Sequence, residues 1–326
     1  MTKIVAFGEV MLRLMPEGHK ELTQTHHLNA MYTGTGVNIL AGLYQLGYQA
    51  ALLTCLPDNR VGFAAASSLR ALGIHDDLVF YEGNHLGAYF LEMGFGSRSS
   101  KVTYMNRTHS SFALADYSNL DYDSILNGID ALHVCGIAFI NDTTFDAALN
   151  LALEARRRSI EVIFDCNFRP SLWDDRKLAD SQAMYDAMLA QATIVFAGIQ
   201  DATKLTSIKE IKSNAEALSH FRNHYGIKTL FGTNRSDNRL QGFMINDNGY
   251  TESKWYTLDV LDRIGAGDGF ATGAIYTQFE TYSDKDAVEF ACAAGVLAHT
   301  IHGDSFILSK SDIENVVNNT IPDVIR

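Results

Sequence analysis

The sequence is poor in cysteine and proline. Its 326 residues include only 4 of each. The cysteines, Cys55, Cys135, Cys166 and Cys292, are widely spaced and form no CxxC pair. This spacing predicts buried free thiols and favours a reducing compartment over a disulfide framework. So few prolines also argue against a proline-punctuated linker between domains.

Long apolar runs and an excess of basic charge are missing as well. No apolar run reaches the roughly 18 residues that a membrane-spanning helix needs. The N-terminus enters a strand pattern directly, so we expect no signal peptide and a cytoplasmic location. The formal net charge of −12 argues against nucleic acid as a partner. It leaves room for a local basic pocket that binds an anionic small molecule, and it leaves homo-oligomers open.

Short apolar runs alternate with amphipathic stretches along most of the chain. Because this alternation is typical of a mostly parallel sheet with helices on both faces, we predict an α/β fold. The expected strands are Lys3–Gly8, Ala50–Cys55, Ala131–Cys135, Glu161–Asp165, Thr193–Ala197 and Lys228–Gly232. The expected helices are Val37–Leu46, Val61–Leu72, Thr143–Arg158, Lys177–Gln191, Lys212–Tyr225 and Asp284–Ile301.

Two polar, glycine-bearing segments, about 11–33 and 85–113, break this alternation. Within the second, Tyr89–Met93 and Lys101–Tyr104 are predicted to be two strands of a small sheet. Ligands of parallel α/β sheets bind beyond the carboxyl ends of the strands. We therefore expect both segments to form a lid over that edge, within one domain that spans residues 1–326.

The strongest chemical signal is the run Gly265-Ala266-Gly267-Asp268, which precedes a predicted helix. Small residues at a helix start leave backbone N–H groups bare, and the helix dipole adds positive potential, so a phosphate fits there. A carboxylate repels a bound phosphate, so its presence at this position suggests a chemical role. Asp268 could accept the proton of an attacking hydroxyl. A glycine-rich turn capped by an acid, without catalysis, explains this stretch about equally well.

Two further segments carry ligand chemistry. In Thr33-Gly34-Thr35-Gly36-Val37-Asn38, Gly34 permits close approach of a ligand and Asn38 can hydrogen-bond hydroxyl groups. It fails as a dinucleotide fingerprint, because Ile39 stands where the third glycine is needed. In Asp165–Trp173, Arg169 follows a strand and presents a planar fork that matches a carboxylate or phosphate. The alternatives are a plain helix start for the first segment and a structural ion pair for Arg169.

These motifs resemble the ribokinase-like (PfkB) sugar kinases, from Lys3 to Asp304. The resemblance implies that Asp268 is the catalytic base, that Gly265, Ala266 and Gly267 form an anion hole, and that ATP and Mg²⁺ are the cofactors. The segment around Arg169 looks like the 2-keto-3-deoxygluconate kinases of the family, in which the arginine binds the substrate carboxylate. The other substrate contacts implied are Gly34, Asn38, Tyr89, Tyr104 and Arg107. For the two tyrosines, ordinary strand packing is an equal alternative.

Three of the candidate site residues stand where the sequence departs from the family pattern. Arg107 follows Tyr104 by three residues rather than two, which on a regular strand would turn it to the other face unless a bulge intervenes. Asp201 stands where the family has the Glu of an Asn-x-x-Glu motif, and Thr233 lies in an altered phosphate segment. We expect both near the nucleotide and Mg²⁺. His299 and His302 lack a third ligand, so no resident metal is predicted.

The sequence thus predicts an ATP-dependent kinase for the terminal hydroxyl of 2-keto-3-deoxygluconate. Three alternatives stay open, namely a fructokinase, a 5-dehydro-2-deoxygluconate kinase and a non-catalytic sugar-binding homologue.

Overall fold

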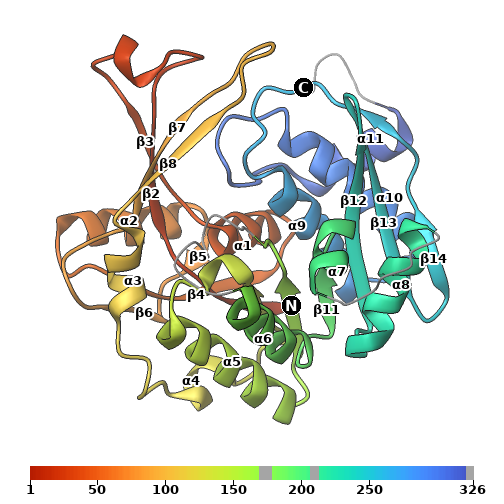
Figure 1. Cartoon of the computed structure of the whole chain (residues 1–326), viewed down its shortest axis with the longest axis horizontal. Helices are drawn as coiled ribbons and strands as arrows, with labels where there is room; N and C mark the ends of the chain where they lie inside the picture. Colours follow the sequence, from red (N-terminus) through yellow and green to blue (C-terminus); the bar gives the residue numbers. More distant parts are fainter. Residues whose placement is uncertain (169–177, 206–212, 321–326) are drawn as a thin grey trace.

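The computed structural model describes residues 1–168, 178–205 and 213–320. Strands and helices alternate along most of the chain, as the apolar and amphipathic stretches predict. The strands form a central sheet and a smaller sheet that projects from it (Figure 1). The prediction of an α/β fold with a mostly parallel central sheet is confirmed.

The central sheet contains a parallel block in the order β12-β11-β10-β9-β1-β4-β5. Its strands are β1 (Lys3–Phe7), β4 (Gln49–Leu56), β5 (Ile74–His75), β9 (Ala131–Cys135), β10 (Glu161–Asp165), β11 (Ile194–Phe196) and β12 (Thr229–Ser236), and β6 (Val79–Tyr81) also pairs with β4. From β1 the chain builds outward first to β4 and later to β9, so the topology changes direction beside β1. Such a switch point creates a crevice at the carboxyl ends of the strands.

An antiparallel extension, which sequence analysis missed, continues the sheet beyond β12. It consists of β13 (Arg239–Asn246), β14 (Gly249–Glu252) and β15 (Tyr256–Thr257). The tight turn between β12 and β13 contains Asp237 with φ +53°, a left-handed conformation that aspartate tolerates better than most residues. The predicted strand at Lys228–Gly232 is therefore only the first half of a long hairpin arm.

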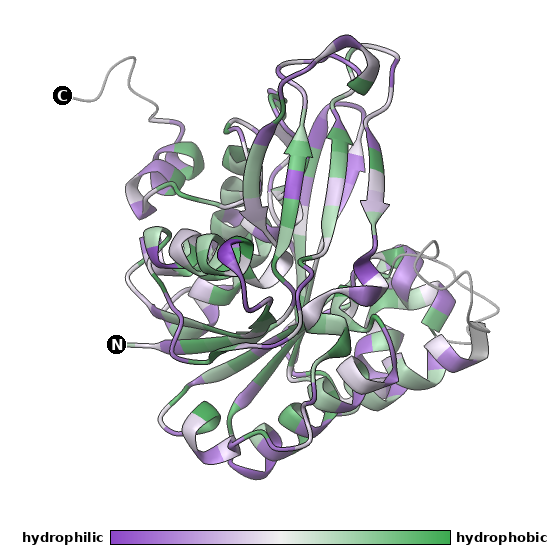
Figure 2. Ribbon diagram, turned by 90° about the vertical axis from the view of Figure 1, so that its left-hand side faces the viewer, coloured by the Kyte–Doolittle hydropathy of each residue, from purple (hydrophilic) through white to green (hydrophobic). Residues whose placement is uncertain are grey.

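Helices cover both faces of the central sheet and divide the hydrophobic interior into two cores. Ile4 and Ala6 of β1 face a core with α1, α9 and α10, whereas Val5 and Phe7 face a core with α5, α6 and α8. This alternation follows from the two-residue period of a strand. The helices are α1 (Thr35–Gln45), α2 (Arg60–Ala71), α3 (Ser111–Leu114), α4 (Tyr122–Leu126), α5 (Asp142–Arg157), α6 (Leu178–Leu189), α7 (Ile199–Leu205), α8 (Asn214–Tyr225), α9 (Ala266–Phe279), α10 (Asp284–Ala298) and α11 (Lys310–Asn318). In Figure 2 the strands between the helices are mostly hydrophobic, which shows the buried sheet.

The smaller sheet, which we call the lid sheet, has the order β3-β2-β7-β8. Its strands are β2 (Met11–Met15), β3 (Asn29–Thr33), β7 (Ala88–Glu92) and β8 (Lys101–Met105), all inside the two segments that break the alternation. The sheet stands away from the helical body in both views (Figures 1 and 2). It packs its own small core, to which Met11, Met15, Tyr89, Leu91 and Met93 contribute.

All four cysteines are buried and free, which confirms the prediction from their spacing. Within residues 1–168, 178–205 and 213–320, no helix combines the length and the apolar character that crossing a membrane would require.

His133 is a polar residue in the middle of the buried sheet. It lies on β9 between Ala6 of β1 and Ile163 of β10, and its side chain is fully buried. Neither ring nitrogen has a hydrogen-bond partner among the residues that the structure describes. Burial lowers the pKa of His133 from 6.5 to about 4, so the ring is neutral in the folded protein.

We predict that His133 makes the fold sensitive to acid. Between pH 6.5 and 4 the unfolded chain binds a proton at this residue and the folded chain does not, so stability falls as the pH falls. The pKa difference corresponds to about 3 kcal/mol. His133→Leu should remove this loss, measured by urea unfolding at pH 7 and pH 4.5. The exposed His75→Gln is the control. An equal effect of His133→Leu at both pH values would contradict the prediction.

Candidate active site

The turn before α9 has the geometry of an anion site. Gly265 is the residue before the first turn and has φ +81°, and a Cβ added there would lie 2.2 Å from the backbone oxygen of Asp304. Only glycine fits this position. Gly267 differs, because a Cβ added there would meet no atom within 4 Å. Since the first N–H groups of a helix have no partner within the helix, the turn presents donors toward open space.

Asp268 lies in the first turn of α9, beside this open space. The side-chain nitrogen Nδ2 of Asn38 donates a hydrogen bond of 2.6 Å to Oδ2 of Asp268. Asn38 belongs to α1, so the bond joins two helices that are 230 residues apart in the sequence. A hydrogen bond donated to a carboxylate favours its ionised form, which is the form that a general base needs.

Hydroxyl groups determine which way the Asn38 amide points. Thr33 Oγ1 lies 3.1 Å from Asn38 Oδ1, and Ser305 Oγ lies 3.3 Å from the same oxygen. Thr33 has a single hydroxyl hydrogen and also lies 2.7 Å from Oδ2 of Asp304, so Ser305 is the donor that remains for Asn38 Oδ1. The amide accordingly turns its NH₂ group toward Asp268. Gly34, between Thr33 and α1, comes so close to Glu9 that a Cβ would lie 2.2 Å from the Glu9 backbone oxygen.

The two predicted lid tyrosines face each other across β7 and β8. Tyr89 is directly opposite Tyr104 in the register, with ring centroids 5.9 Å apart. Tyr89 is buried and its hydroxyl donates a 2.9 Å hydrogen bond to Oδ2 of Asp304, whereas Tyr104 is 42% exposed. Burial raises the pKa of Tyr89, so it stays a neutral donor. Tyr104 is therefore the more accessible of the two to a ligand.

Arg107 is placed by a turn that the sequence did not reveal. Strand β8 ends at Met105, Asn106 adopts a left-handed φ of +46°, and Arg107 begins a short 3₁₀ helix, η2 (Arg107–His109). The guanidinium is buried, and its Nε donates a 2.7 Å hydrogen bond to Oε2 of Glu9. Its Nη2 donates to the backbone oxygen of Ile137. Arg107 therefore lies beyond the end of the strand, so the prediction about which strand face it occupies does not apply. Glu9 neutralises the positive charge of its guanidinium.

Arg13 is the principal site residue that sequence analysis missed. Its side chain on β2 is fully buried and forms ion pairs with Asp262, at 2.8 Å, and with Asp304. Asp262 precedes the anion turn and accepts from the backbone N–H of Ile264 at 3.0 Å, while Asp304 lies behind Gly265. An arginine at an alternating strand position gives no local sign that it will be buried.

The predicted nucleotide-side residues lie on the other half of the sheet. Asp201 follows β11, and its Oδ2 accepts a 2.8 Å hydrogen bond from the backbone N–H of Gly198. Thr233 lies on β12 opposite Gly242 of β13. Arg169 lies outside the described residues. Within the described ranges, no group of three or more His, Cys, Asp or Glu side chains could hold a metal ion by itself.

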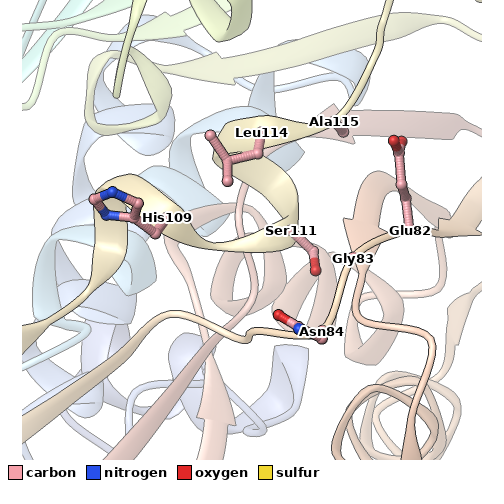
Figure 3. Close-up of a pocket in the computed structure, with 7 residues that line it drawn as sticks. All are labelled: Glu82, Gly83, Asn84, His109, Ser111, Leu114 and Ala115. Atoms are coloured by element: carbon pink, nitrogen blue, oxygen red, sulfur yellow. The ribbon is translucent and has the colours of Figure 1, made fainter.

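A separate surface pocket lies between the segment that precedes β7 and the segment that forms η2 and α3 (Figure 3). Its lining residues are Glu82, Gly83, Asn84, His109, Ser111, Leu114 and Ala115. None of the predicted site residues lines it, so it does not form part of the candidate active site.

Comparisons with known proteins identify the family and agree with the fold. Two solved structures superpose on all or nearly all of the chain. One is from Enterococcus faecalis, with 37% identity, a TM-score of 0.94 and coverage of 100% of this chain and 99% of the other. The second is the 2-dehydro-3-deoxygluconokinase of Thermotoga maritima, with 31% identity, a TM-score of 0.92 and coverage of 97% and 98%.

Two curated relatives also match at full length. The 2-dehydro-3-deoxygalactonokinase of Haloferax volcanii is 24% identical, over 97% of this chain and 96% of its own. The 5-dehydro-2-deoxygluconokinase of Bacillus subtilis is 22% identical, over 96% and 95%. Residues 1–311 match the family described as pfkB family carbohydrate kinase. A phosphotransferase fold, an open anion turn and a hydrogen-bonded carboxylate beside it thus coincide with the family match, and the chain belongs to the pfkB family of carbohydrate kinases.

Proposed function

We propose that this carbohydrate kinase is a sugar-acid kinase that transfers the γ-phosphoryl group of ATP to the terminal hydroxyl of 2-keto-3-deoxygluconate. The observation that carries the proposal is the contact of Asn38 with Asp268 beside the open turn Gly265–Gly267. The kinases named above act on ketodeoxy sugar acids, which supports this substrate class.

In the proposed reaction Asp268 accepts the proton of the terminal hydroxyl as its oxygen bonds to the γ-phosphorus. The bond from the γ-phosphorus to ADP breaks, and the products are the phosphorylated sugar acid and ADP. The N–H groups of Gly265, Ala266 and Gly267 stabilise the charge on the transferring group. Magnesium usually binds through one or two carboxylates together with phosphates, which fits a chain without a dedicated metal cluster in its described part.

The remaining predicted residues divide between the two substrates. Arg169 would bind the carboxylate of the sugar acid. Gly34, Asn38, Tyr89 and Tyr104 would contact its hydroxyl groups. Arg107 would act through its packing under Tyr104, since its guanidinium lies 5.9 Å from that ring and pairs with Glu9. On the nucleotide side, Asp201 and Thr233 would lie near Mg²⁺ and the phosphates.

One alternative substrate has a specific observation in its favour. The match to a 5-dehydro-2-deoxygluconokinase makes 5-dehydro-2-deoxygluconate the second candidate. An ATP-consumption assay against 2-keto-3-deoxygluconate, 2-keto-3-deoxygalactonate, 5-dehydro-2-deoxygluconate and fructose decides between them. The proposal is wrong if another member of the panel has a higher kcat/KM than 2-keto-3-deoxygluconate.

The first prediction about the active site concerns the base. Asp268→Asn should lower kcat by about 10²–10⁴-fold, because the variant cannot accept the hydroxyl proton. Binding of the sugar acid, measured by calorimetry, should change little. The exposed acid Asp259 on the loop before the turn provides the control variant Asp259→Asn, which should retain wild-type kcat. A kcat for Asp268→Asn within a few-fold of wild type would exclude this role.

The second prediction separates the two glycines of the turn. Gly265→Ala should destabilise the fold by roughly 1–3 kcal/mol, because it strains a left-handed residue and forces a Cβ against Asp304. Gly267→Ala should preserve or raise stability, since its Cβ meets open space and alanine favours a helix. Its kcat should nevertheless fall, because the methyl group would stand where the phosphoryl group approaches. Urea unfolding and steady-state kinetics test both; full activity in Gly267→Ala would argue against an anion at this amide.

The third prediction tests recognition of the carboxylate. Losing one charged hydrogen-bond partner costs roughly 1.5–3 kcal/mol, or about 10- to 150-fold in kcat/KM. Arg169→Ala should impair 2-keto-3-deoxygluconate by that amount. Any residual activity on fructose, which has no carboxylate, should change far less. Equal losses on both sugars would show that Arg169 has a structural role instead.

A further inference from the structure

Two exposed arginines, Arg235 and Arg263, lie beside the anion turn without a neutralising partner. Arg263 precedes Gly265 by two residues, and Arg235 is near the end of β12. Neither forms an ion pair with a carboxylate in the part of the chain that the structure describes. By contrast, the buried guanidiniums of Arg13 and Arg107 are each paired with carboxylates. Arg235 and Arg263 therefore differ from the two buried arginines in having no carboxylate partner among the described residues.

His299 holds both arginines in place. Its Nε2 lies 2.9 Å from Nη2 of Arg235, and its Nδ1 lies 2.7 Å from the backbone oxygen of Gly295. Because that carbonyl can only accept, Nδ1 carries the proton and Nε2 accepts from the guanidinium. The backbone oxygen of His299 also accepts from the N–H groups of Leu261 and Asp262, at 2.8 and 3.2 Å, which fixes the segment that leads into Arg263.

This arrangement orients positive charge without cancelling it. His299 is fully buried, and burial lowers its pKa, so the ring is a neutral acceptor. Although Arg235 is exposed as a whole residue, partial burial of its guanidinium lowers its pKa, and the nearby positive charge of Arg263 lowers it further. The two guanidiniums are therefore near enough to repel each other. An anion bound between the two guanidiniums would relieve this repulsion.

We propose that Arg235 and Arg263 form a phosphate-binding pair that holds the polyphosphate of ATP next to the Gly265–Gly267 turn, an assignment that rests on the proposed kinase function. A guanidinium matches phosphate oxygens with two parallel hydrogen bonds. Neutral His299 acts as the positioning residue for Arg235.

The position of the pair favours the nucleotide over the sugar acid. Strand β12 lies at the side of the parallel block opposite β1, β4 and β5 in the sheet order. The lid sheet, with Tyr89 and Tyr104, follows β1 and stands on the other side of α9 from β12 (Figure 1). A polyphosphate also carries several charges, enough for two arginines, whereas a sugar acid carries a single carboxylate.

Calorimetric binding of MgATP, inorganic tripolyphosphate and adenosine to the full chain tests this proposal. Arg235→Met and Arg263→Met keep most of each apolar stem and remove the charge. Each substitution should weaken the binding of MgATP and of tripolyphosphate by about 10- to 150-fold, the range expected for the loss of a charged hydrogen bond. Adenosine affinity and the KM of the sugar acid should stay unchanged. Arg239→Met is the matched control, because it removes the same charge from the β12–β13 hairpin, where Arg239 lies over the Trp255 ring.

The role of His299 is tested by a double-mutant cycle. His299→Leu should weaken MgATP binding in the wild-type background. In the Arg235→Met background it should cause little further loss of affinity, because His299 acts through that arginine. If the buried substitution prevents folding, the two exposed arginine variants still decide the proposal.

Two results would overturn the proposal. One is an affinity for MgATP within about twofold of wild type in both arginine variants, which is far less than the loss expected for a charged hydrogen bond. The other is a rise in the KM of the sugar acid with unchanged MgATP affinity, which would assign the pair to the substrate carboxylate. Binding is measured without turnover, so inactivity of the wild type on 2-keto-3-deoxygluconate would remove the proposed substrate and leave the result on the arginines intact.

Discussion

The buried guanidinium of Arg13 connects the lid sheet to the turn before α9. It projects from β2 of the lid sheet and pairs with Asp262, ahead of the anion turn, and with Asp304, behind it. Removing one partner from a buried ion pair costs about 3–5 kcal/mol, because a charge is left without compensation. The backbone oxygen of Asp304 in turn defines the space that only Gly265 can fill. The lid sheet and the anion turn are therefore held in one fixed relation.

Asp304 extends this connection to the candidate base. Its carboxylate accepts one hydrogen bond from each of three lid strands, through Arg13 on β2, Thr33 on β3 and Tyr89 on β7. Thr33 also contacts the amide oxygen of Asn38, whose NH₂ group points at Asp268. The orientation of the amide that donates to Asp268 thus depends on the lid sheet being in place. A substitution in the lid could reduce catalysis without touching the substrate.

Sequence reasoning succeeded where the determinant is local. Apolar runs predicted the parallel strands, and the small residues before Asp268 indicated a helix start with bare N–H groups. It failed where the determinant is a distant partner. Arg13 meets Asp262 and Asp304 across 249 and 291 residues, and nothing near it distinguishes a buried arginine from an exposed one. Asn106 adopts a left-handed conformation that turns Arg107 inward. This conformation likewise depends on tertiary packing and cannot be read from the local sequence.

The arginines of the candidate site differ in whether a carboxylate neutralises them. Buried carboxylates neutralise Arg13 and Arg107, so these two side chains contribute to the structure and add little positive potential at the crevice. Arg235 is held instead by a neutral imidazole, which supplies position without an opposite charge. Local potential depends on which charges are compensated, and the overall charge of −12 does not determine it. An uncompensated arginine beside the N-terminus of α9 reinforces the helix dipole, and both favour negative charge at the same place.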